Sequence, residues 1–460
     1  MHLDDTIVAV STPPGRGGLG VVRLSGPEAR AVAAPLLRLK SELEAQRALF
    51  GELVEPASGE RLDEVVVTFF QKPHSYTTDD VVEISAHGAP VVLRRVVELC
   101  LERGARLAEP GEFTLRAFLH GRLDLTQAEA VRDLIESQTL YQAKVAAQQL
   151  EGALSRRLAP IKEKLVGLIA LLEAGIDFAE DDVPVLPDEQ IAHSILQVRE
   201  PLAALAESFA YGKVVHEGLT LAIVGRPNVG KSSLFNRLVE RERAIVTAAP
   251  GTTRDLVSET VALAGIPVHL VDTAGLRQAQ DEAETIGVQK SMEALADADL
   301  VLVVLDASQP RAREDEELLA SVRERAHIAV ENKIDVRRQT SDVSRASTGN
   351  RKLGTGNILP TSALTGEGIP ALREEILRHV RGEAGAQAES GFLTNARHQG
   401  LVRESLAALE AAAESARNHI PHEMILLDLY TALRPLDAVT GQTTADDILN
   451  RIFSSFCIGK

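Results

Sequence analysis

Aromatic residues are scarce in this 460-residue chain, which contains no tryptophan and four tyrosines. At 3% of the composition, they do not provide a broad platform for stacking nucleobases. The two cysteines, Cys100 and Cys457, do not form the disulfide framework of a small secreted domain, and a reducing cytoplasm fits them. No apolar run is long enough to span a membrane, and residues 1–6 lack the features of a signal peptide. We therefore expect a cytoplasmic protein without a membrane segment.

Positive charge is also in deficit, because 49 lysines and arginines face 66 acidic residues and the net charge is −17. Bulk electrostatics would repel nucleic acids and anionic membranes, so any contact with RNA must use a local basic patch or a partner protein. The hydrophobic fraction of 45% and the charged fraction of 25% are those of an ordinary globular protein. The length exceeds what one hydrophobic core supports, so we expect roughly two to four domains.

The strongest motif in the chain is Gly225-Arg-Pro-Asn-Val-Gly-Lys-Ser-Ser233. An apolar run at 219–224 precedes it and a helical pattern at 233–239 follows it, which is the strand–loop–helix context of a phosphate-binding loop. Lys231 can reach the β- and γ-phosphates of a nucleotide, and the Ser232 hydroxyl can ligate Mg²⁺. The alternative, a glycine-rich turn that binds nothing, fits poorly because strand, loop and helix agree.

Motifs for a metal and a γ-phosphate follow in order. Thr253, within the run 251–255, can complete the Mg²⁺ shell. The run 268–275 reads as a strand that ends in Asp-x-x-Gly, where Asp272 can hold the metal through water and the Gly275 N–H can sense the γ-phosphate.

The next motifs select the base. After predicted strands at 300–305 and 328–331 comes Asn332-Lys-Ile-Asp335, whose Asp335 carboxylate can accept from both the N1–H and the 2-amino group of guanine. Adenine does not offer this donor pattern, so an ATP-dependent kinase or motor is excluded. Thr361-Ser-Ala-Leu364, after a strand at 358–360, can close over the base with its backbone N–H groups. Together the ordered motifs predict GTP binding.

Two positions in this region leave alternatives open. Leu276 follows the Asp-x-x-Gly motif and cannot orient an attacking water molecule, so either hydrolysis is slow or another polar group acts. Asp281, Glu282 and Glu284 are candidates, although all three could simply be solvated carboxylates at a helix start. Asn228 in the phosphate loop could ligate a cation or only form a turn.

Residues 1–120 read as mixed α and β structure, with strands at 6–9, 20–24, 65–70 and 81–86 and a helix at 90–103. The glycine-rich run 12–20 could approach a ligand closely or be an ordinary hairpin connection. Arg16 and Arg23 could hold a carboxylate or be solvated, Glu83 lies in mid-strand, and His87 could belong to a site or a turn.

Helical patterns flank the phosphate-loop region on both sides. A capping box at Thr126-Gln-Ala-Glu129 predicts the start of a long helical stretch that reaches about residue 175, with interruptions at Gly152 and Pro160. Pro187 starts a further helix that ends near residues 211–212. After a linker at 383–391, three helices are expected at 394–415, 421–439 and 444–452. We therefore expect one helical domain into which a nucleotide-binding domain is inserted.

The whole chain closely resembles the MnmE (TrmE) family of bacterial tRNA-modification GTPases. The resemblance is carried by the ordered GTPase motifs and by five short runs, at residues 5–8, 12–18, 75–77, 110–114 and 457–460, the last being Cys-Ile-Gly-Lys. It implies a multidomain α/β fold with an N-terminal α+β folate-binding domain, an α-helical domain and an inserted P-loop GTPase (Ras-like) α/β domain. The expected boundaries are 1–121 for the folate-binding and dimerisation domain, 122–216 and 385–460 for the two parts of the helical domain, and 217–384 for the GTPase domain.

The resemblance also implies a reaction and partners. Members of the family form homodimers and, with the FAD protein MnmG (GidA) in a heterotetramer, install a (carboxymethyl)aminomethyl-type group at carbon 5 of the wobble uridine of certain tRNAs. A tetrahydrofolate, in its 5-formyl or 5,10-methylene form, is implied as the one-carbon cofactor, together with Mg²⁺, K⁺ and GTP as substrate. We expect tRNA to be contacted largely through MnmG.

Residue roles carried over from the family settle several of the open alternatives as expectations. The folate would be held by Arg23, Glu83, Arg122 and Lys460, and potassium by Asn228, Thr247, Ala249 and Thr252, with Ala249 giving only its carbonyl. Glu284 would position the hydrolytic water, with Lys231 and Arg277 as further catalytic candidates and Cys457 as a residue of open chemical role. Motifs and resemblance together give the GTP-binding set Asn228, Val229, Gly230, Lys231, Ser232, Ser233, Thr247, Thr252, Thr253, Asp272, Thr273, Ala274, Gly275, Asn332, Lys333, Asp335, Ser362 and Ala363, with Ser232 and Thr253 as magnesium ligands.

These expectations compete with one rival. A GTP-switched assembly factor, for example for ribosomes, would carry the same GTPase motifs but have no use for a folate. Arg23, the terminal Cys-Ile-Gly-Lys and the long helical flanks favour the tRNA-modification hypothesis, in which GTP brings two GTPase domains together and hydrolysis releases them.

Overall fold

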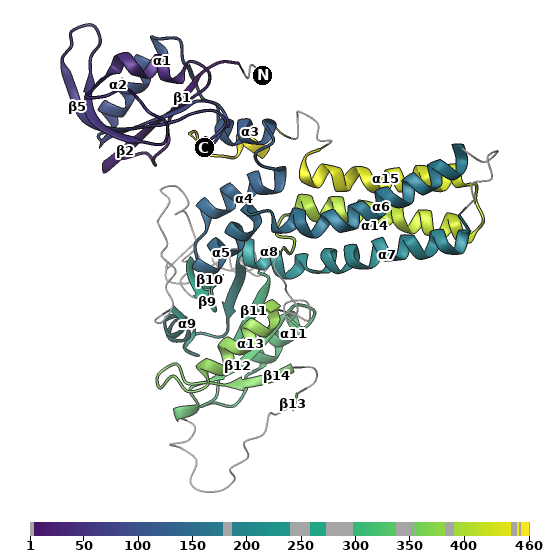
Figure 1. The fold of residues 1–460 in the computed structure, drawn as a ribbon. Coiled ribbons are helices and arrows are strands. Elements are labelled where there is room, and N and C mark those ends of the chain that lie inside the picture. Colours follow the sequence, from purple (N-terminus) through teal and green to yellow (C-terminus); the bar gives the residue numbers. More distant parts are fainter. Residues whose placement is uncertain are drawn as a thin grey trace, which may run out of the picture. The chain divides into compact units, whose positions relative to one another are not determined.

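The computed structural model describes residues 4–177, 186–239, 258–272, 298–336, 352–353, 356–381, 391–442, 449 and 452–459 (Figure 1). The chain forms two compact units. Unit 1 comprises residues 1–132, 149–155 and 433–460, and unit 2 comprises residues 133–148 and 156–432. Unit 1 is built on a mostly antiparallel sheet, and unit 2 combines a helical bundle with a mostly parallel sheet, so the predicted multidomain α/β class is confirmed.

The described part of unit 1 contains a seven-stranded sheet with the order β3-β4-β5-β6-β2-β1-β7. Neighbouring strands are antiparallel except β1 and β7, which are parallel. The strands are β1 (Ile7–Val10), β2 (Gly17–Ser25), β3 (Leu37–Leu39), β4 (Ala48–Val54), β5 (Arg61–Phe70), β6 (Val81–Gly88) and β7 (Arg106–Leu107).

One face of this sheet is covered by α2 (Pro90–Leu101) and the short α1 (Ala29–Ala33). Val22 and Leu24 of β2 point into this core, so Arg23 between them points to the opposite face. The four strands and the helix predicted for this region are confirmed, while β3, β4 and β7 lacked a clear signal in the sequence.

The C-terminal residues complete unit 1. Phe453 and Phe456 are buried against Leu115 of α3 (Glu112–Leu119) and Leu125 of α4 (Leu125–Glu136). The capping box predicted at Thr126 and Glu129 is wrong by two residues. Asp124 accepts from the Gln127 N–H at 2.9 Å, and the Gln127 side chain accepts from the Asp124 N–H at 3.0 Å, because α4 begins one residue before Thr126.

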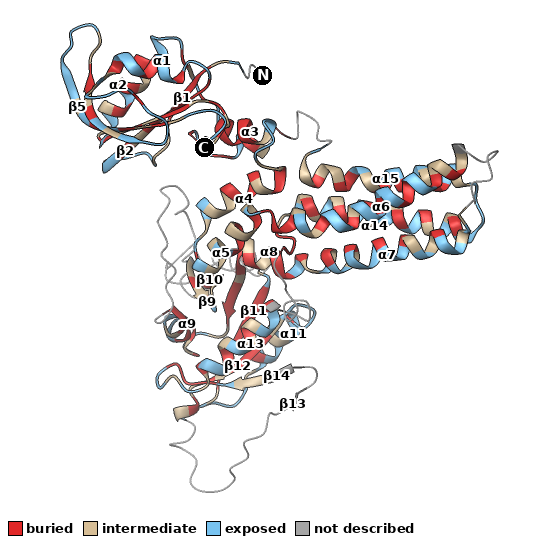
Figure 2. Ribbon diagram, in the orientation of Figure 1, coloured by how far each residue is buried: buried red, intermediate tan, exposed pale blue. Residues whose placement is uncertain are grey.

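Unit 2 contains α7 (Asp188–Glu207), α14 (Ala396–Arg417), nearly all of α6 (Ala153–Asp177) and the part of α15 (His422–Thr440) up to residue 432, which form a helical bundle. Most of α5 (Leu140–Leu150) and all of α8 (Phe209–Glu217) belong to the same unit. Buried residues lie along the inner sides of these helices in Figure 2. On α7 they recur at Ile191, Ile195, Val198, Leu202 and Leu205, the spacing of an apolar helical stripe.

Three of the predicted helix limits differ from the structure. The break at Gly152, which separates α5 from α6, is confirmed, but Pro160 lies inside α6 and does not interrupt it. Buried neighbours such as Leu158 and Ile161 hold the helix where local propensity alone would break it. The stretch also breaks at 137–139, and α7 ends at Glu207 rather than near residue 211.

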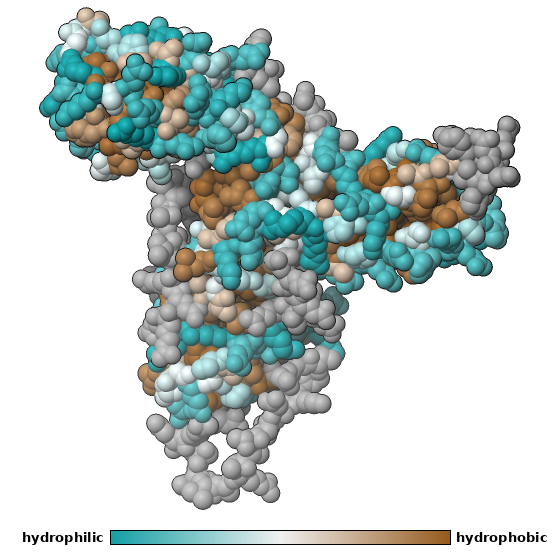
Figure 3. Space-filling view, in the orientation of Figure 1, coloured by the Kyte–Doolittle hydropathy of each residue, from teal (hydrophilic) through white to brown (hydrophobic). Residues whose placement is uncertain are grey.

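Some apolar side chains remain exposed on the bundle. Ile420 before α15, and Met424 and Leu427 within it, are more than one-third exposed, and Figure 3 shows apolar surface over this part of the bundle. Within the described ranges, no helix is both long and apolar enough to cross a membrane.

The described sheet of unit 2 has the order β13-β14-β12-β11-β8-β10-β9. Strands β14, β12, β11, β8 and β10 are parallel, and β13 and β9 are antiparallel edges. The strands are β8 (Leu219–Val224), β9 (Ser258–Leu263), β10 (Ile266–Asp272), β11 (Leu300–Asp306), β12 (His327–Asn332), β13 (Lys352–Leu353) and β14 (Gly356–Pro360). Parallel strands end at the same edge of a sheet, so the loops that follow β8, β11, β12 and β14 gather there.

Helices α9 (Lys231–Val239), α11 (Arg313–Ser321) and α13 (Ile369–Arg381) accompany this sheet. The chain enters it directly after α8 and returns to the bundle at α14, which packs against α7. This connectivity agrees with an inserted domain, while the boundaries at 121, 216 and 384 stay predictions.

A cluster of four charged side chains, centred on the buried Arg116 and Glu112, links three segments of unit 1. Arg116 is fully buried and donates to Asp5 at 2.5 Å and to Glu112 at 3.0 Å, and Arg106 donates to both carboxylates. Burial opposes ionisation of Glu112, but hydrogen bonds from Arg106, the Glu109 N–H and Arg116 outweigh it and hold its pKa below the usual value. The cluster joins β1, β7 and α3 in one network.

Replacing Glu112 with Gln should destabilise unit 1 by about 3 kcal/mol at pH 7, because the guanidinium of Arg116 loses a buried counter-charge. A lowered pKa stabilises the fold above the ordinary carboxyl value of 4.5, and the benefit is lost as the pH falls below it. The difference between wild type and Glu112→Gln should therefore shrink below about pH 4.5. Hydrogen exchange of the β1 amides measures both effects. The control is Glu55→Gln, which loses an ion pair between two partly exposed side chains, Glu55 and Arg95. Equal exchange in both variants would contradict the assignment.

Candidate functional site

The predicted phosphate loop lies between β8 and α9, at the carboxyl edge of the parallel strands. Lys231 is the first residue of α9 and is buried, and its Nζ donates to the carbonyl groups of Gly225 and Arg226, both at 2.8 Å. Ser232 is exposed at the N-terminus of the same helix, where backbone N–H groups and the helix dipole favour an anion.

Two glycines of the loop are required by close contacts. A Cβ on Gly225 would lie 2.4 Å from the carbonyl oxygen of Val304, and one on Gly230 would lie 2.4 Å from Nδ2 of Asn332. Asn228, between them, has a positive φ of 65°, which asparagine tolerates better than most residues. The loop is thereby pressed against the ends of β11 and β12.

Asn332 joins the phosphate loop to residues 361–364, the loop predicted to close over the base, called the base loop below. Its side chain is buried, donates from Nδ2 to the Val229 carbonyl at 3.0 Å and accepts at Oδ1 from the Ala363 N–H at 3.0 Å. Asp335, three residues on, accepts from the Ser362 hydroxyl at 2.6 Å. The sequence motifs at 225–233, 332–335 and 361–364 are thus brought together as predicted.

Lys333 fixes the other side of the phosphate loop. Its Nζ donates to the Asn228 carbonyl at 2.6 Å and to Asp306 at 2.8 Å. Burial would raise the pKa of Asp306, but the hydrogen bonds from Lys333 and Ser308 outweigh this and lower it. Asp306 therefore stays ionised and keeps Lys333 over the loop.

A further ion pair at the loop was not found from the sequence. Arg226 donates from Nε to Asp315 at 2.7 Å, and Asp315 also accepts from the Ala312 N–H at the start of α11. The Asp315 side chain is 2% exposed, so this pair tethers the phosphate loop to α11 in a nearly dry setting. The acidic start of α11 was a visible helix signal, but no motif connected it to the loop.

Several predicted site residues lie outside the described part of the chain. Asp272 is the last residue of β10, although its side chain is not described. The predicted site residues that lie wholly outside the described part are Thr247, Ala249, Thr252, Thr253, Thr273, Ala274, Gly275, Arg277, Glu284 and Lys460. Leu276 and the alternative carboxylates Asp281 and Glu282 also lie outside. Their roles stay predictions.

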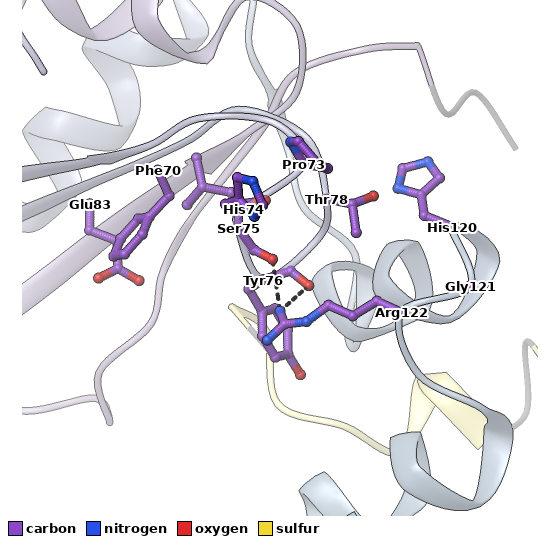
Figure 4. A pocket seen from close by; sticks show the side chains of 11 residues that line it. Phe70, Pro73, His74, Ser75, Tyr76, Thr78, Glu83, His120, Gly121 and Arg122 are labelled. Atoms are coloured by element: carbon purple, nitrogen blue, oxygen red, sulfur yellow. Dashed lines mark hydrogen bonds between the residues drawn. The ribbon is translucent and has the colours of Figure 1, made fainter. Parts of the chain in front are cut away.

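A second candidate site lies in unit 1. A cavity of about 730 Å³ opens between the loop 70–78, β6 and the turn after α3 (Figure 4). Its lining consists of Phe70, Pro73, His74, Ser75, Tyr76, Thr78, Val81, Glu83, His120, Gly121 and Arg122. Two of the four residues predicted to bind a folate, Glu83 and Arg122, are among them.

The charged groups around this cavity are fixed by neighbours. Arg23 and Glu83 face each other across β2 and β6 and form an ion pair of 2.7 Å. Arg122 donates to the carbonyls of Ser75 at 2.9 Å and Tyr76 at 2.6 Å, and its guanidinium lies 5.1 Å from the centre of the Tyr76 ring (Figure 4). The acidic Glu83 and the cationic Arg122 thus line one cavity, and each is bound to a different partner rather than to the other.

Two polar lining groups were not predicted. Ser75 is 8% exposed, and its hydroxyl has no hydrogen-bond partner among the described residues, which is costly unless a ligand or water supplies one. Nδ1 of His120 lies 2.6 Å from the Thr77 carbonyl, which can only accept, so Nδ1 carries a proton and neutral His120 keeps Nε2 as an acceptor. No spacing pattern in the sequence could reveal either group.

The C-terminal segment docks on the same unit. Ile458 forms a β-bridge with Pro110, and the Gly459 carbonyl accepts from the Ser11 hydroxyl at 3.2 Å and from Arg23 at 3.5 Å. Gly459 has a φ of 97°, and a Cβ there would lie 2.5 Å from the Val10 carbonyl oxygen. Cys457 is exposed in this docked segment.

The described side chains of the two sites do not by themselves suggest a metal centre. Among the described residues, no three His, Cys, Asp or Glu side chains are grouped to hold a metal ion. The donor chemistry at the phosphate loop is instead that of hydroxyl, amide and backbone oxygens, which suits hard cations such as Mg²⁺ and K⁺.

Comparison with known families gives two matches that together span most of the chain. Residues 6–122 match the model of the GTP-binding protein TrmE N-terminus, and residues 125–457 match that of the MnmE helical domain. The second match covers more than half of the chain.

Curated relatives align over the full length. The tRNA modification GTPase MnmE of Koribacter versatilis is 68% identical, with 100% of both chains covered. The MnmE of Aquifex aeolicus is 45% identical, with 99% of this chain and 100% of the relative covered. Among solved structures, the G domain of the T. maritima FeoB iron transporter is 28% identical over 35% of this chain and 98% of its own, with a TM-score of 0.27, too low to support a conclusion.

The two cysteines should differ strongly in reactivity. Burial raises the pKa of the fully buried Cys100 to about 12, whereas Cys457 is exposed. N-ethylmaleimide at neutral pH should therefore modify Cys457 at least about a hundredfold faster than Cys100, as followed by mass spectrometry of the native protein. A Cys457→Ser variant should react only after denaturation, and rapid labelling of that variant would show that the core around Cys100 opens.

Proposed function

Because this chain belongs to the MnmE family of tRNA modification GTPases, we propose that it binds and hydrolyses GTP and takes part in the modification of tRNA. The observation that carries the nucleotide assignment is the joining of the phosphate loop and the base loop through the buried Asn332 side chain. Asp335 lies beside the base loop, where its carboxylate would accept from N1–H and the 2-amino group of guanine.

Phosphate binding would rest on Lys231 and on the N–H groups at the start of α9. Lys231 is held by carbonyls of the loop, so its ammonium would turn to the β- and γ-phosphates with little reorganisation. The exposed Ser232 hydroxyl, with Thr253, would hold Mg²⁺, which neutralises charge on the phosphates. We assign orientation of the attacking water to Glu284, because Leu276 has no polar group, with Arg277 as a further candidate in the same segment.

We further propose potassium at the Asn228 side of the loop. The amide oxygen of Asn228, the hydroxyls of Thr247 and Thr252 and the carbonyl of Ala249 form an all-oxygen donor set. A cation held there would supply the positive charge that other GTPases take from an arginine. Lys333 and Asp315 support this part of the loop from two sides, through Asn228 and Arg226.

The cavity in unit 1 would bind a reduced folate. Of the two carboxylate oxygens of Glu83, Oε1 pairs with Arg23, and no contact of Oε2 is recorded among the described residues, so Oε2 can accept from the amino group and ring N–H of a pterin. Arg122 and Lys460 would hold the carboxylates at the other end of the folate. The Ser75 hydroxyl, which has no partner in the described part of the chain, offers one more polar contact. A folate in this cavity would supply the one-carbon unit of the modification.

The remaining parts of the proposal concern partners. We propose that the protein acts in the cytoplasm as a homodimer, and that with MnmG it adds a (carboxymethyl)aminomethyl group at carbon 5 of the wobble uridine. With a net charge of −17, the chain is a poor general surface for RNA, which favours tRNA contacts made largely by the partner. Pairing and release of the GTPase domains would gate this chemistry.

Steady-state GTP hydrolysis in matched KCl and NaCl tests the potassium site. KCl should stimulate kcat at least about tenfold, because the cation stabilises charge that develops in the transition state. Asn228→Ala should remove the stimulation, while Asn418→Ala at the end of α14, in the bundle, should retain it. Equal rates in both salts would remove potassium from the mechanism and leave GTP hydrolysis in place.

Titration with 5-formyltetrahydrofolate tests the cavity and separates the proposal from the rival assembly factor. Wild type should bind, and Glu83→Gln should weaken binding about tenfold or more, because the amide places a donor where the ligand also donates. Glu52→Gln, on β4 and paired with Arg38, is the matched control. A wild-type protein that hydrolyses GTP but binds no folate would favour the assembly factor.

A further inference from the structure

Arg237 lies two turns into α9, on the helix that begins with the phosphate-binding Lys231. Its side chain reaches the base loop rather than solvent. Nε donates to the Ala363 carbonyl at 3.1 Å, and a terminal nitrogen donates to the Leu364 carbonyl at 2.6 Å. One guanidinium therefore binds the carbonyl oxygens of two successive residues of the loop. The planar guanidinium suits this role because its N–H donors have fixed directions.

These two hydrogen bonds also fix the direction of the backbone N–H that follows the Ala363 carbonyl. In a trans peptide the C=O and the following N–H point in opposite directions. With the Ala363 carbonyl turned towards α9, the Leu364 N–H points away from it. The Ala363 N–H already donates to Asn332, and in the part of the chain that the structure describes no acceptor is recorded for the Leu364 N–H.

The helix that carries Arg237 is itself held at this end. Arg373 of α13 donates to the Leu238 carbonyl at 3.2 Å and to the Arg237 carbonyl at 3.5 Å. Leu234 and Leu238 of α9 are fully buried in the core. The N-terminus of α9 lies at the phosphate loop and its last turns contact the base loop, so this one helix fixes the distance between the two loops.

We infer that Arg237 is a positioning residue for recognition of the guanine base, acting through the carbonyl groups of Ala363 and Leu364. This inference rests on the proposed binding of GTP. The Leu364 N–H, which these hydrogen bonds orient, would face the acceptor O6 of guanine, where adenine carries an amino group that donates. Arg237 thus contributes to the preference for guanine without contacting the nucleotide.

The test compares Arg237→Ala, Arg237→Lys and the control Arg378→Ala in the full-length protein. Arg378 is an exposed arginine on α13 that pairs with Glu375 and does not contact the base loop. The readouts are the Kd for fluorescent GDP, competition by GTP and ATP, and kcat and KM for GTP in KCl.

Arg237→Ala should raise the Kd for GDP and the KM for GTP about tenfold, with kcat at saturation little changed, because the loop is loosened while the phosphate site is intact. Competition by ATP relative to GTP should improve, since the loop no longer holds its donors against the adenine amino group. Arg237→Lys should recover part of the loss, because an ammonium donates to carbonyls but lacks the fork. Arg378→Ala should match wild type.

The inference is overturned if Arg237→Ala keeps the wild-type Kd and selectivity, or if kcat falls as far as affinity. Hydrogen exchange of amides 361–366 adds a measurement that does not depend on turnover: Arg237→Ala should speed their exchange and leave the β8 amides unchanged, and unchanged loop amides would also overturn it. A wild-type protein that fails to bind GDP would instead refute the proposed function, so the two failures are distinguishable.

Discussion

The nucleotide half of this molecule depends on one buried amide. Asn332 donates to the phosphate loop and accepts from the base loop, and it is 1% exposed, so neither bond competes with water. Gly230 must lack a side chain for the same reason, because a Cβ would displace Nδ2 of Asn332. The other contacts of the site, Lys333 to Asn228 and Arg226 to Asp315, add rigidity to a loop whose position Asn332 already defines.

The two candidate sites use cations in different ways. At the phosphate loop, Lys333 is paired with Asp306 and Arg226 with Asp315. The charge of these cations is balanced by the protein, and their role is to hold the loop in place. In the cavity of unit 1, Arg122 is held by two carbonyls, which orient the guanidinium without neutralising it. A cation fixed by neutral acceptors keeps its charge for an anionic ligand, which fits a folate with its carboxylates.

Much of this arrangement could be predicted from the sequence, and the reasons for the rest are physical. Lys231, Asn332 and Asp335 follow strand ends in a fixed order, so local patterns and the parallel sheet suffice to bring them together. His120, Asp315 and Arg237 belong to no motif, because each makes its contact with a residue that is distant in sequence, namely Thr77, Arg226 and Ala363. Pro160 was misjudged for a related reason: buried neighbours in the bundle outweigh the local preference of one residue.

The docking of the C-terminal segment has a consequence for how the protein is made. Ser11 and Gly459, which share a hydrogen bond, are 448 residues apart. At bacterial rates of synthesis of about 5–20 residues per second, the first strands wait roughly 20 to 90 s on the ribosome before their partner segment exists. Once Leu125 has been made, the surface around Leu115 and Leu125 stays uncovered until Phe453 and Phe456 are synthesised. Unit 1 is therefore the first to begin folding and among the last to be finished.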